Sequence, residues 1–302
     1  MRPGHASRTA EHNALFRALE SSFPQDRRLF VDSLARAFLT PPLSHVARLG
    51  AVPGLRGRVC SFIDTRWPGV RASVVARTRL IDDTVIASVD EQTAQVVILG
   101  AGYDSRAHRL PNLRDVTVFE VDHPDTQRAK QRALDKALPV VPTNVRYVAT
   151  DFDQEPFEAA MAAAGYQDRV RTVFLWEGVT NYLSAAAVDA TLRWCSRAAA
   201  GSLLIFTYVH LDVLTNPDRF VGADRLLATL AAAGEKLTFG IEPTRLPQML
   251  ADRGLSLERD LGAAEYRELY FGERARSMRG HEFYRVAFAR IDGERATPAG
   301  CS

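Results

Sequence analysis

The chain has 302 residues, of which 46% are hydrophobic and 25% are charged, and its formal net charge is +2. This is the composition of an ordinary globular protein with one large core. The low net charge, with arginines interleaved among acids, excludes the basic tract of a nucleic-acid-binding protein. No apolar run approaches the length that spans a bilayer. We therefore expect neither a nucleic acid nor a membrane as partner.

The cysteines Cys60, Cys195 and Cys301 are far apart in the sequence and odd in number. They form neither a CxxC pair nor a disulfide framework, and we predict no metal site. The opening residues MRPGHASRTAEHN lack the apolar core of a signal peptide. These features favour a reducing, cytoplasmic location.

Residues 9–94 have a mostly helical pattern. Leu15, Phe16 and Leu19 recur at the spacing of one helix face, and several prolines divide the stretch into short pieces. We predict a helical N-terminal cap over residues 1–94, ahead of the sheet.

From Gln95 onward, apolar runs alternate with amphipathic segments, which is the pattern of a parallel sheet wound with helices. The predicted strands are residues 96–99, 116–121, 145–148, 172–176 and 203–209, and then 255–259 and 283–290. A polar, helical segment at about 211–250 predicts a lid after the fifth strand. Because residues 262–280 show no clear crossover helix, we expect the last two strands to pair antiparallel. The chain is thus predicted to be an α/β protein whose core, residues 95–302, has a mostly parallel seven-stranded sheet with helices on both faces.

Acidic residues follow four neighbouring predicted strands. They are Asp104, behind the turn Gly100-Ala101-Gly102, and then Asp122, Asp151 and Glu177. Since the ligand of an open parallel sheet lies at the carboxyl ends of its strands, we expect these carboxylates to share one rim.

This rim discriminates between two classes of cofactor. Asp104 would repel the pyrophosphate of a nicotinamide dinucleotide, and Ser105 stands where such sites have a third glycine. S-adenosylmethionine carries no phosphate, and it offers an ammonium, a sulfonium, two ribose hydroxyls and an adenine amino group to carboxylates. The rim therefore favours S-adenosylmethionine.

The candidate residues are assigned to separate parts of this cofactor. Asp122, about 20 residues after the glycines, is placed to accept both ribose hydroxyls, and Asp151 with Phe152 to hold the adenine. The carboxylate of the cofactor needs a cation, and Arg8 and Arg77 of the cap would clamp it. The predicted cofactor-binding residues are Arg8, Arg77, Gly100, Ala101, Gly102, Asp104, Asp122, His123, Asp151, Phe152, Glu177 and Gly178.

With these residues in order and spacing, the chain resembles the leucine carboxyl methyltransferase family, particularly its bacterial branch, which includes O-methyltransferases of polyketide pathways. The matching segments are Ser7-Arg-Thr-Ala10, Arg77-Thr-Arg-Leu-Ile-Asp-Asp83, Val97-Ile-Leu-Gly-Ala-Gly-Tyr-Asp-Ser-Arg106, Phe119-Glu-Val-Asp-His-Pro124 and Glu177-Gly-Val-Thr-Asn-Tyr-Leu183. The resemblance implies a class I methyltransferase sheet, a helical cap, a lid after the fifth strand, and cofactor contacts at Arg8, Arg77, Gly100, Asp122, Asp151, Phe152 and Glu177. It also implies a small-molecule acceptor, whereas the eukaryotic members methylate the C-terminal carboxylate of a phosphatase subunit. The match fades beyond Leu192, where the acceptor pocket would be built.

Methyl transfer is an in-line displacement, for which a protein aligns an acceptor oxygen and excludes water. A carboxylate acceptor is already ionised, whereas a hydroxyl acceptor must lose a proton to a base. His210, directly after the fifth strand, is the candidate base, and Tyr182 is the candidate acceptor contact. The alternatives are a structural hydrogen bond for His210 and ordinary packing for Tyr182.

We predict an S-adenosylmethionine-dependent O-methyltransferase that acts on a small molecule, with a carboxyl acceptor favoured over a hydroxyl, in natural-product biosynthesis. A protein C-terminal carboxyl methyltransferase and a non-catalytic S-adenosylmethionine-binding protein are the alternatives. A nicotinamide dehydrogenase is disfavoured by Asp104 and Ser105.

Overall fold

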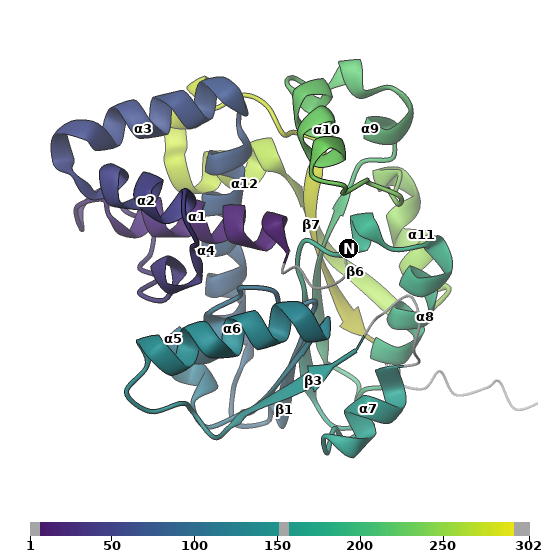
Figure 1. Cartoon of the computed structure of the whole chain (residues 1–302). Coiled ribbons are helices and arrows are strands. Elements are labelled where there is room, and N and C mark those ends of the chain that lie inside the picture. The colour runs from purple at the N-terminus through teal and green to yellow at the C-terminus, as the bar shows by residue number, and fades with distance from the viewer. Residues whose placement is uncertain (1–6, 151–156, 293–302) are drawn as a thin grey trace, which may run out of the picture.

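The computed structural model describes residues 7–150 and 157–292, and within these residues a twisted seven-stranded sheet carries helices on both faces (Figure 1). The strand order is β3-β2-β1-β4-β5-β7-β6. The strands are β1 (Gln95–Leu99), β2 (Thr117–Asp122), β3 (Val145–Ala149), β4 (Thr172–Trp176), β5 (Leu203–Val209), β6 (Leu255–Gly262) and β7 (Tyr284–Ile291). All pairs from β3 to β5 are parallel, which confirms the predicted α/β fold.

The central strands are apolar along their whole length because helices cover both of their faces. Every residue of β1, β4 and β5 is buried, whereas β3, at one edge of the sheet, has only two buried residues, Val145 and Val148. A parallel strand that is buried on both sides is typically a continuous apolar run.

The last two strands confirm the expected antiparallel pairing, with one correction between them. Strand β7 lies between β5 and β6 and runs antiparallel to both. The connection that lacked a clear helical pattern contains the helix α12 (Ala263–Phe271) and the 3-10 helix η6 (Gly272–Ser277). Helix α12 buries Tyr266 and Arg267, and the hydroxyl of Tyr266 hydrogen bonds to Ser73 at 2.6 Å. Because a charged residue, Arg267, stands on the buried face of α12, the apolar periodicity that predicts a helix is interrupted there.

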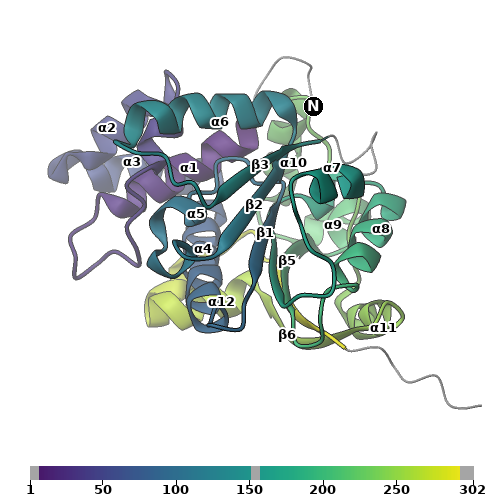
Figure 2. The same cartoon turned by 90° about the horizontal axis from the view of Figure 1, so that it is seen from below.

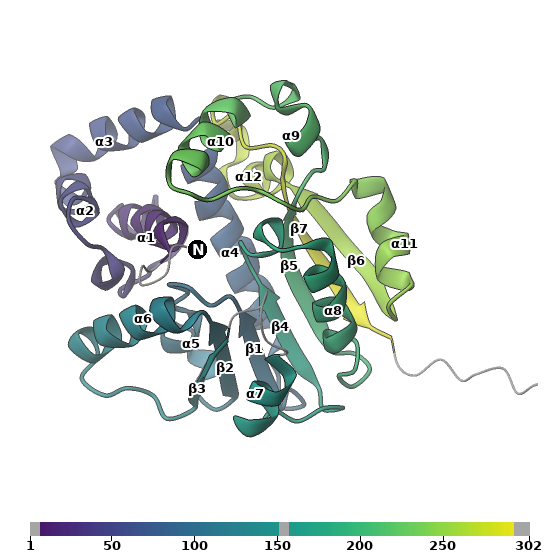
Figure 3. The ribbon, with the colours of Figure 1, turned by 45° about the vertical axis from the view of Figure 1, so that its right-hand side comes forward.

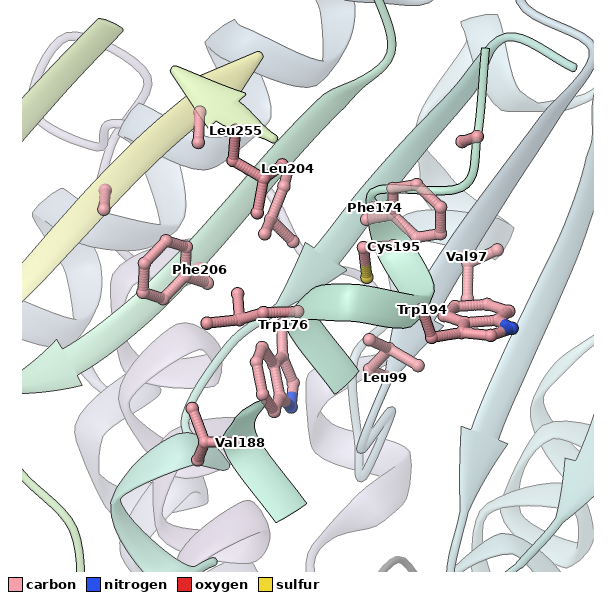
Figure 4. Close-up of a cluster of buried hydrophobic side chains, with 14 of the residues drawn as sticks. Val97, Leu99, Phe174, Trp176, Val188, Trp194, Cys195, Leu204, Phe206 and Leu255 are labelled. Atoms are coloured by element: carbon pink, nitrogen blue, oxygen red, sulfur yellow. The ribbon is translucent and has the colours of Figure 1, made fainter. Parts of the chain in front are cut away.

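Helices cover both faces of the sheet. On one face lie α4 (Val70–Ser88), α5 (Arg106–Arg109) and α12. On the other face lie α7 (Phe157–Ala163), α8 (Ala185–Cys195) and α11 (Leu246–Ala251). Figure 4 shows the hydrophobic core between the sheet and the helices of this second face. In it, the ring of Trp194 packs edge-on against Phe174, with ring centroids 5.5 Å apart.

The cap is helical, as predicted, and it shares a third core with a helix of the sheet domain. It contains α1 (Arg8–Ser21), η1 (Ala35–Phe38), α2 (Leu43–Ala51) and α3 (Pro53–Arg66). Its core includes Leu134 of α6 (Pro124–Ala137), and Figure 2 shows α6 alongside α1. Helix α4, by contrast, belongs to the cap by sequence position but packs directly on the sheet.

The segment after β5 forms the predicted lid. It contains α9 (Asp212–Thr215), η4 (Pro217–Arg219) and α10 (Ala223–Ala232), and it leads to η5 (Pro243–Arg245) before α11. The indole nitrogen of Trp67 in the cap donates to the hydroxyl of Thr229 in α10 at 3.2 Å. The lid and the cap are therefore in direct contact.

None of the helices in residues 7–150 and 157–292 is both long enough and apolar enough to span a membrane. Cys60 and Cys195 are buried free thiols.

Candidate active site

A cavity of about 510 Å³ lies at the carboxyl ends of β1, β2 and β4. The first turn of α1 and the segment after α10 also line it and are in contact through Thr9 and Glu235, and Figure 3 shows the start of α1 between α6 and α10. This is the edge at which the sequence places its acidic rim, and a cavity of this size is typical of small-molecule sites.

Nine of the predicted site residues line this cavity. They are Gly100, Ala101, Gly102, Asp104, Asp122, His123, Glu177, Gly178 and Tyr182. Three others, Arg8, Arg77 and His210, are not among the described residues that line it. The predicted adenine contacts Asp151 and Phe152 lie outside the described residues.

The turn after β1 requires glycine for two reasons. Gly100 and Gly102 have φ angles of +64° and +43°, in the left-handed region that side chains disfavour. A Cβ atom on Gly100 would lie 2.2 Å from Cγ2 of Val179, so the turn packs closely against the segment that follows β4. The bare backbone of this turn forms part of the cavity wall.

Asp122 holds this turn in place and presents a carboxylate to the cavity. It accepts hydrogen bonds from the backbone N–H groups of Gly102 and His123, the second at 2.6 Å. Burial raises the pKa of Asp122 to about 6, although the two N–H donors oppose the shift. A buried carboxylate with unused lone pairs is well suited to accept further hydroxyl donors.

Glu177 is held from two sides by buried arginines. The Nε atom of Arg77 lies 2.7 Å from Oε1, and a terminal nitrogen of Arg106 lies 2.8 Å from Oε2. Burial would raise the pKa of Glu177, but Arg106 and Arg77 hold it below its ordinary value. Glu177 is therefore an ionised carboxylate in the cavity wall. Arg77 pairs with Glu177 but is not among the described residues that line the cavity, and Arg8 is exposed. The two arginines therefore do not form the clamp that the sequence predicted.

The carboxylate of Asp104 is paired with a neighbouring arginine. This pairing changes the sequence argument that Asp104 would repel the pyrophosphate of a dinucleotide. Its carboxylate accepts the backbone N–H of Arg106 at 2.7 Å and also pairs with the guanidinium of that residue. Burial would raise the pKa of Asp104, but Arg106 holds it below its ordinary value. The cofactor class inferred from this residue is confirmed below. The charge that was expected to repel a phosphate, however, is compensated within the protein.

These pairs belong to a buried network that joins the cap to the site. Arg106 also donates to Asp82 at 2.7 Å, and Asp82 accepts from Arg109 at the same distance. Arg109 donates to the hydroxyl of Ser105 at 3.0 Å. The Ser105 hydroxyl donates to Asp32 at 2.7 Å, and Asp32 pairs with Arg17 at 2.8 Å. The network holds four arginines (Arg17, Arg77, Arg106, Arg109) and four acids (Asp32, Asp82, Asp104, Glu177), so its formal charges cancel.

His210 takes part in a polar cluster at the base of the lid. Its Nδ1 accepts the backbone N–H of Asp212 at 3.1 Å, and its Nε2 lies 3.8 Å from Glu242. Burial lowers the pKa of His210, with Arg219 opposing the effect of Glu242. Ligand atoms of His210, Asp212 and Glu242 lie within 4.8 Å of one another, but Asp212 is paired with Arg219 and Nδ1 is already an acceptor. His210, Asp212 and Glu242 therefore form a structural polar cluster rather than a metal site.

Tyr182 lies in η3 (Thr180–Tyr182), and burial, followed by the nearby Glu235, raises the pKa of its hydroxyl. The hydroxyl of Thr9, in the first turn of α1, donates to the carboxylate of Glu235, which follows α10. Thr9, Tyr182 and Glu235 all line the cavity. Thr9 stands inside one matching segment, but nothing in the sequence connects it with a lid residue 226 positions away.

The mostly parallel sheet with its antiparallel β7, and the acidic site at the carboxyl ends of the strands, are typical of the class I methyltransferase fold. The chain belongs to the leucine carboxyl methyltransferase family, whose model matches residues 10–196. The buried Asp122 and the glycine turn fit S-adenosylmethionine, since the one suits a ribose diol and the other allows close backbone approach.

Relatives and solved structures agree with this assignment. A protein of Frankia alni that carries the provisional name S-adenosyl-L-methionine-dependent methyltransferase is 35% identical over 202 residues, which are 66% of this chain and 67% of the relative. One of the same provisional name from Rhodococcus jostii is 36% identical over 217 residues, 72% of this chain and 64% of the relative. A solved DUF574 family protein from Streptomyces avermitilis shares the fold with a TM-score of 0.55 at 14% identity, covering 84% of this chain and 95% of that one. A solved Thermobifida fusca protein, provisionally named a methyltransferase, matches with a TM-score of 0.54 at 15% identity, covering 92% and 94%. The protein is an S-adenosylmethionine-dependent methyltransferase.

Proposed function

We propose that the protein transfers the methyl group of S-adenosylmethionine to an oxygen atom of a small molecule, in the biosynthesis of a natural product. The observation that carries this proposal is the cavity, whose volume of about 510 Å³ extends from the glycine turn to the lid. A cavity bounded by the cap, the sheet and the lid favours a compact acceptor over a folded protein surface.

Asp122 is the proposed ligand of the two ribose hydroxyls, because its buried carboxylate keeps lone pairs beyond those used by Gly102 and His123. Glu177 is the proposed partner of the cationic end of the cofactor, and Arg77 fixes its carboxylate from behind. The backbone of Gly100 and Gly102 allows close approach of the same end. Once bound, the cofactor supplies an electrophilic methyl group on a sulfonium.

The chain itself contributes alignment and exclusion of water. The lid and the cap are in contact through Trp67 and Thr229, and in the cavity wall through Thr9 and Glu235. Closing the site in this way positions an acceptor behind the methyl group and keeps bulk water from competing with it. A cytoplasmic location stays a prediction from the sequence.

The test is incubation of the purified protein with methyl-labelled S-adenosylmethionine and an extract of the source organism. We expect the label in a small molecule. Label confined to the protein fraction would identify a protein carboxyl methyltransferase instead. Binding of S-adenosylhomocysteine in calorimetry without any transferred label would indicate a non-catalytic binding protein.

A further inference from the structure

A second cavity, of about 480 Å³, is lined by the lid and by the segment that contains α12 and η6. The lid contributes residues 219–221, which lie just before α10. None of the described residues that line this cavity also lines the cavity of the candidate active site. The lining residues are Arg219, Phe220, Val221, Ala264, Arg267, Ala275, Arg276, Arg279 and Glu282.

The described lining of this second cavity carries an excess of positive charge. Arg219 is paired with Asp212, and a terminal nitrogen of Arg267 lies 2.8 Å from Glu282. The other two arginines of the lining are exposed, and neither makes an ion pair with a described residue. Four positive charges are thus met by two negative ones. Uncompensated charges of one sign in a concave surface attract ions of the opposite sign.

Arg267 supplies a fixed positive charge, because its side chain is 3% exposed and is held from two directions. One terminal nitrogen donates to the carbonyl oxygen of Gly280 and the other to the carboxylate of Glu282. Its Nε atom is buried and has no hydrogen-bond partner among the described residues. Buried donors of this kind are rare in proteins, and an ion or a water molecule commonly satisfies them.

Glu282 is the acid in this lining, and its charge is already used within the protein. Besides Arg267, its carboxylate accepts the backbone N–H of Gly280 at 2.7 Å. An anion in the cavity therefore meets a compensated carboxylate rather than a free one. The exposed arginines remain available to it.

Both lining segments pack on the same turn of the cap. A Cβ atom on Gly222, directly after the lid residues of the lining, would lie 3.2 Å from Cδ of Pro68. One on Gly280, in the other segment, would lie 2.4 Å from the carbonyl oxygen of Pro68. The cavity is therefore already formed in the free protein, and little backbone ordering opposes binding.

We propose that this second cavity binds a phosphate group and thereby ties the lid to the segment after α12. Two uncompensated positive charges match the double negative charge of phosphate, and guanidinium groups bind its oxygens in a forked, two-point geometry. Arg219 binds from the lid, and Arg276 and Arg279 bind from the other segment. The phosphate is inorganic or belongs to a metabolite, since both present the same oxygens. This site is independent of the proposed function, because its occupation needs no methyl acceptor.

The first measurement is calorimetry with inorganic phosphate on the full chain saturated with S-adenosylhomocysteine, at about pH 8, where phosphate is doubly charged. We expect one phosphate per chain, with an affinity that falls as sodium chloride is added. Phosphate binding that disappears when S-adenosylhomocysteine is present would place the ion in the active-site cavity and overturn the inference.

Two further ligands identify the source of the phosphate. Tighter binding of glycerol phosphate than of inorganic phosphate would assign the site to a metabolite, and weaker binding would assign it to the free ion. Binding of a polyglutamate peptide but of neither phosphate would overturn the inference and indicate an acidic protein partner.

The second measurement repeats the calorimetry with Arg276→Gln and Arg279→Gln. Each variant should lose about tenfold in phosphate affinity, because hydrogen bonds to charged groups are the strong ones. Arg274→Gln is the matched control, since Arg274 is an exposed arginine of η6 that is not among the described lining residues. Its affinity should be unchanged. An equal loss in all three variants would show only general attraction to a basic surface and would overturn the site.

The third measurement tests the tie to the lid by hydrogen exchange in α9 and α10. At a phosphate concentration of about 100 times Kd, exchange in the unmodified protein should slow by up to about 100-fold, as linkage requires. Arg219→Gln should still bind phosphate but should lose this slowing. Phosphate binding that leaves exchange in the lid unchanged would refute the tie. An unaltered affinity for S-adenosylhomocysteine verifies that each variant is folded.

Discussion

The guanidinium of Arg106 lies 2.8 Å from the carboxylate of Glu177, and this ion pair joins the start of α5 to the residue that follows β4. Arg106 is itself fixed by Asp82, a residue of α4 that does not appear among the described residues lining the cavity. The position of the proposed cofactor-binding carboxylate of Glu177 therefore depends on a residue that is not among the described residues of the cavity wall.

Asp82→Asn should reveal this dependence. The side chain of Asp82 is 4% exposed and it compensates two arginines, Arg106 and Arg109. Breaking a buried pair in this way should lower the free energy of unfolding by about 3 to 5 kcal/mol. Affinity for S-adenosylhomocysteine should also fall by about tenfold, the scale of coupling within one ionic network. Urea unfolding and calorimetry measure the two effects separately.

Asp83→Asn is the control, because it makes the same change at the next position of α4. Asp83 pairs with Arg79, and both side chains are about 40% exposed. Exposed pairs of this kind contribute about 0 to 1 kcal/mol, so we expect little change in stability and none in cofactor affinity. A purely structural role for Asp82 would appear as a stability loss with unchanged affinity. If Asp82→Asn does not fold, Ser105→Ala interrupts the same network between Arg109 and Asp32 and should weaken binding in the same direction.

The parts of the fold that follow from local pattern were predictable from the sequence. Buried parallel strands are continuous apolar runs, so β1, β4 and β5 were located closely. Asp122 and Glu177 were found because chain order places them at strand ends, and the topology then brings those ends together.

The parts of the site that depend on tertiary contacts between distant segments were not predictable. The contact of Thr9 with Glu235 joins the cap to the lid, and neither residue stands in a periodic pattern that could connect them. A different error occurred at Asp104, which lines the cavity but was assigned to the site for an incomplete reason. Its nearest partner, Arg106, is two positions away, but only the fold shows that their charges meet.

Asp122→Ala should weaken cofactor binding through the loss of the ribose contact. Removing a charged acceptor from two hydroxyls should cost on the order of 1 to 3 kcal/mol in the free energy of binding. Calorimetry with S-adenosylhomocysteine, and with an analogue that lacks both ribose hydroxyls, isolates this contact. The variant should bind the two ligands almost equally, whereas the unmodified protein should prefer the natural one. The same loss for both ligands would place the ribose elsewhere.

Cofactor affinity should depend on pH because burial raises the pKa of Asp122 to about 6. A protonated carboxyl is the weaker acceptor, so affinity for S-adenosylhomocysteine should fall as pH drops below 6, by at most about tenfold per pH unit. The stability of the cofactor-free protein should change with pH in the opposite direction to the cofactor affinity. A folded-state pKa above the unfolded value contributes stability that is present below about pH 4 and is lost as pH rises through 6. Calorimetry and urea unfolding between about pH 5 and 8 test both signs, and Asp122→Ala should flatten both profiles.

Gly100→Ala, compared with Gly201→Ala, should separate two reasons for glycine in the turn after β1. Both residues have positive φ, +64° and +80°, so both variants should lose about 1 to 2 kcal/mol of unfolding free energy from the left-handed backbone. A Cβ on Gly201 meets nothing within 4 Å, whereas one on Gly100 would lie 2.2 Å from Cγ2 of Val179. Gly100→Ala should therefore cost about 1 to 3 kcal/mol more, the usual penalty of overpacking.

The added cost at Gly100 should depend on Val179. The double variant Gly100→Ala with Val179→Ala lacks the Cγ2 methyl group of Val179 that the new Cβ would meet. Much of the extra loss of unfolding free energy should therefore be recovered in it. Its cofactor affinity shows whether the turn has returned to its original position. Additive losses in that double variant would mean that Val179 already moves aside. The close approach would then not be what requires glycine at this position, and backbone conformation alone would explain it.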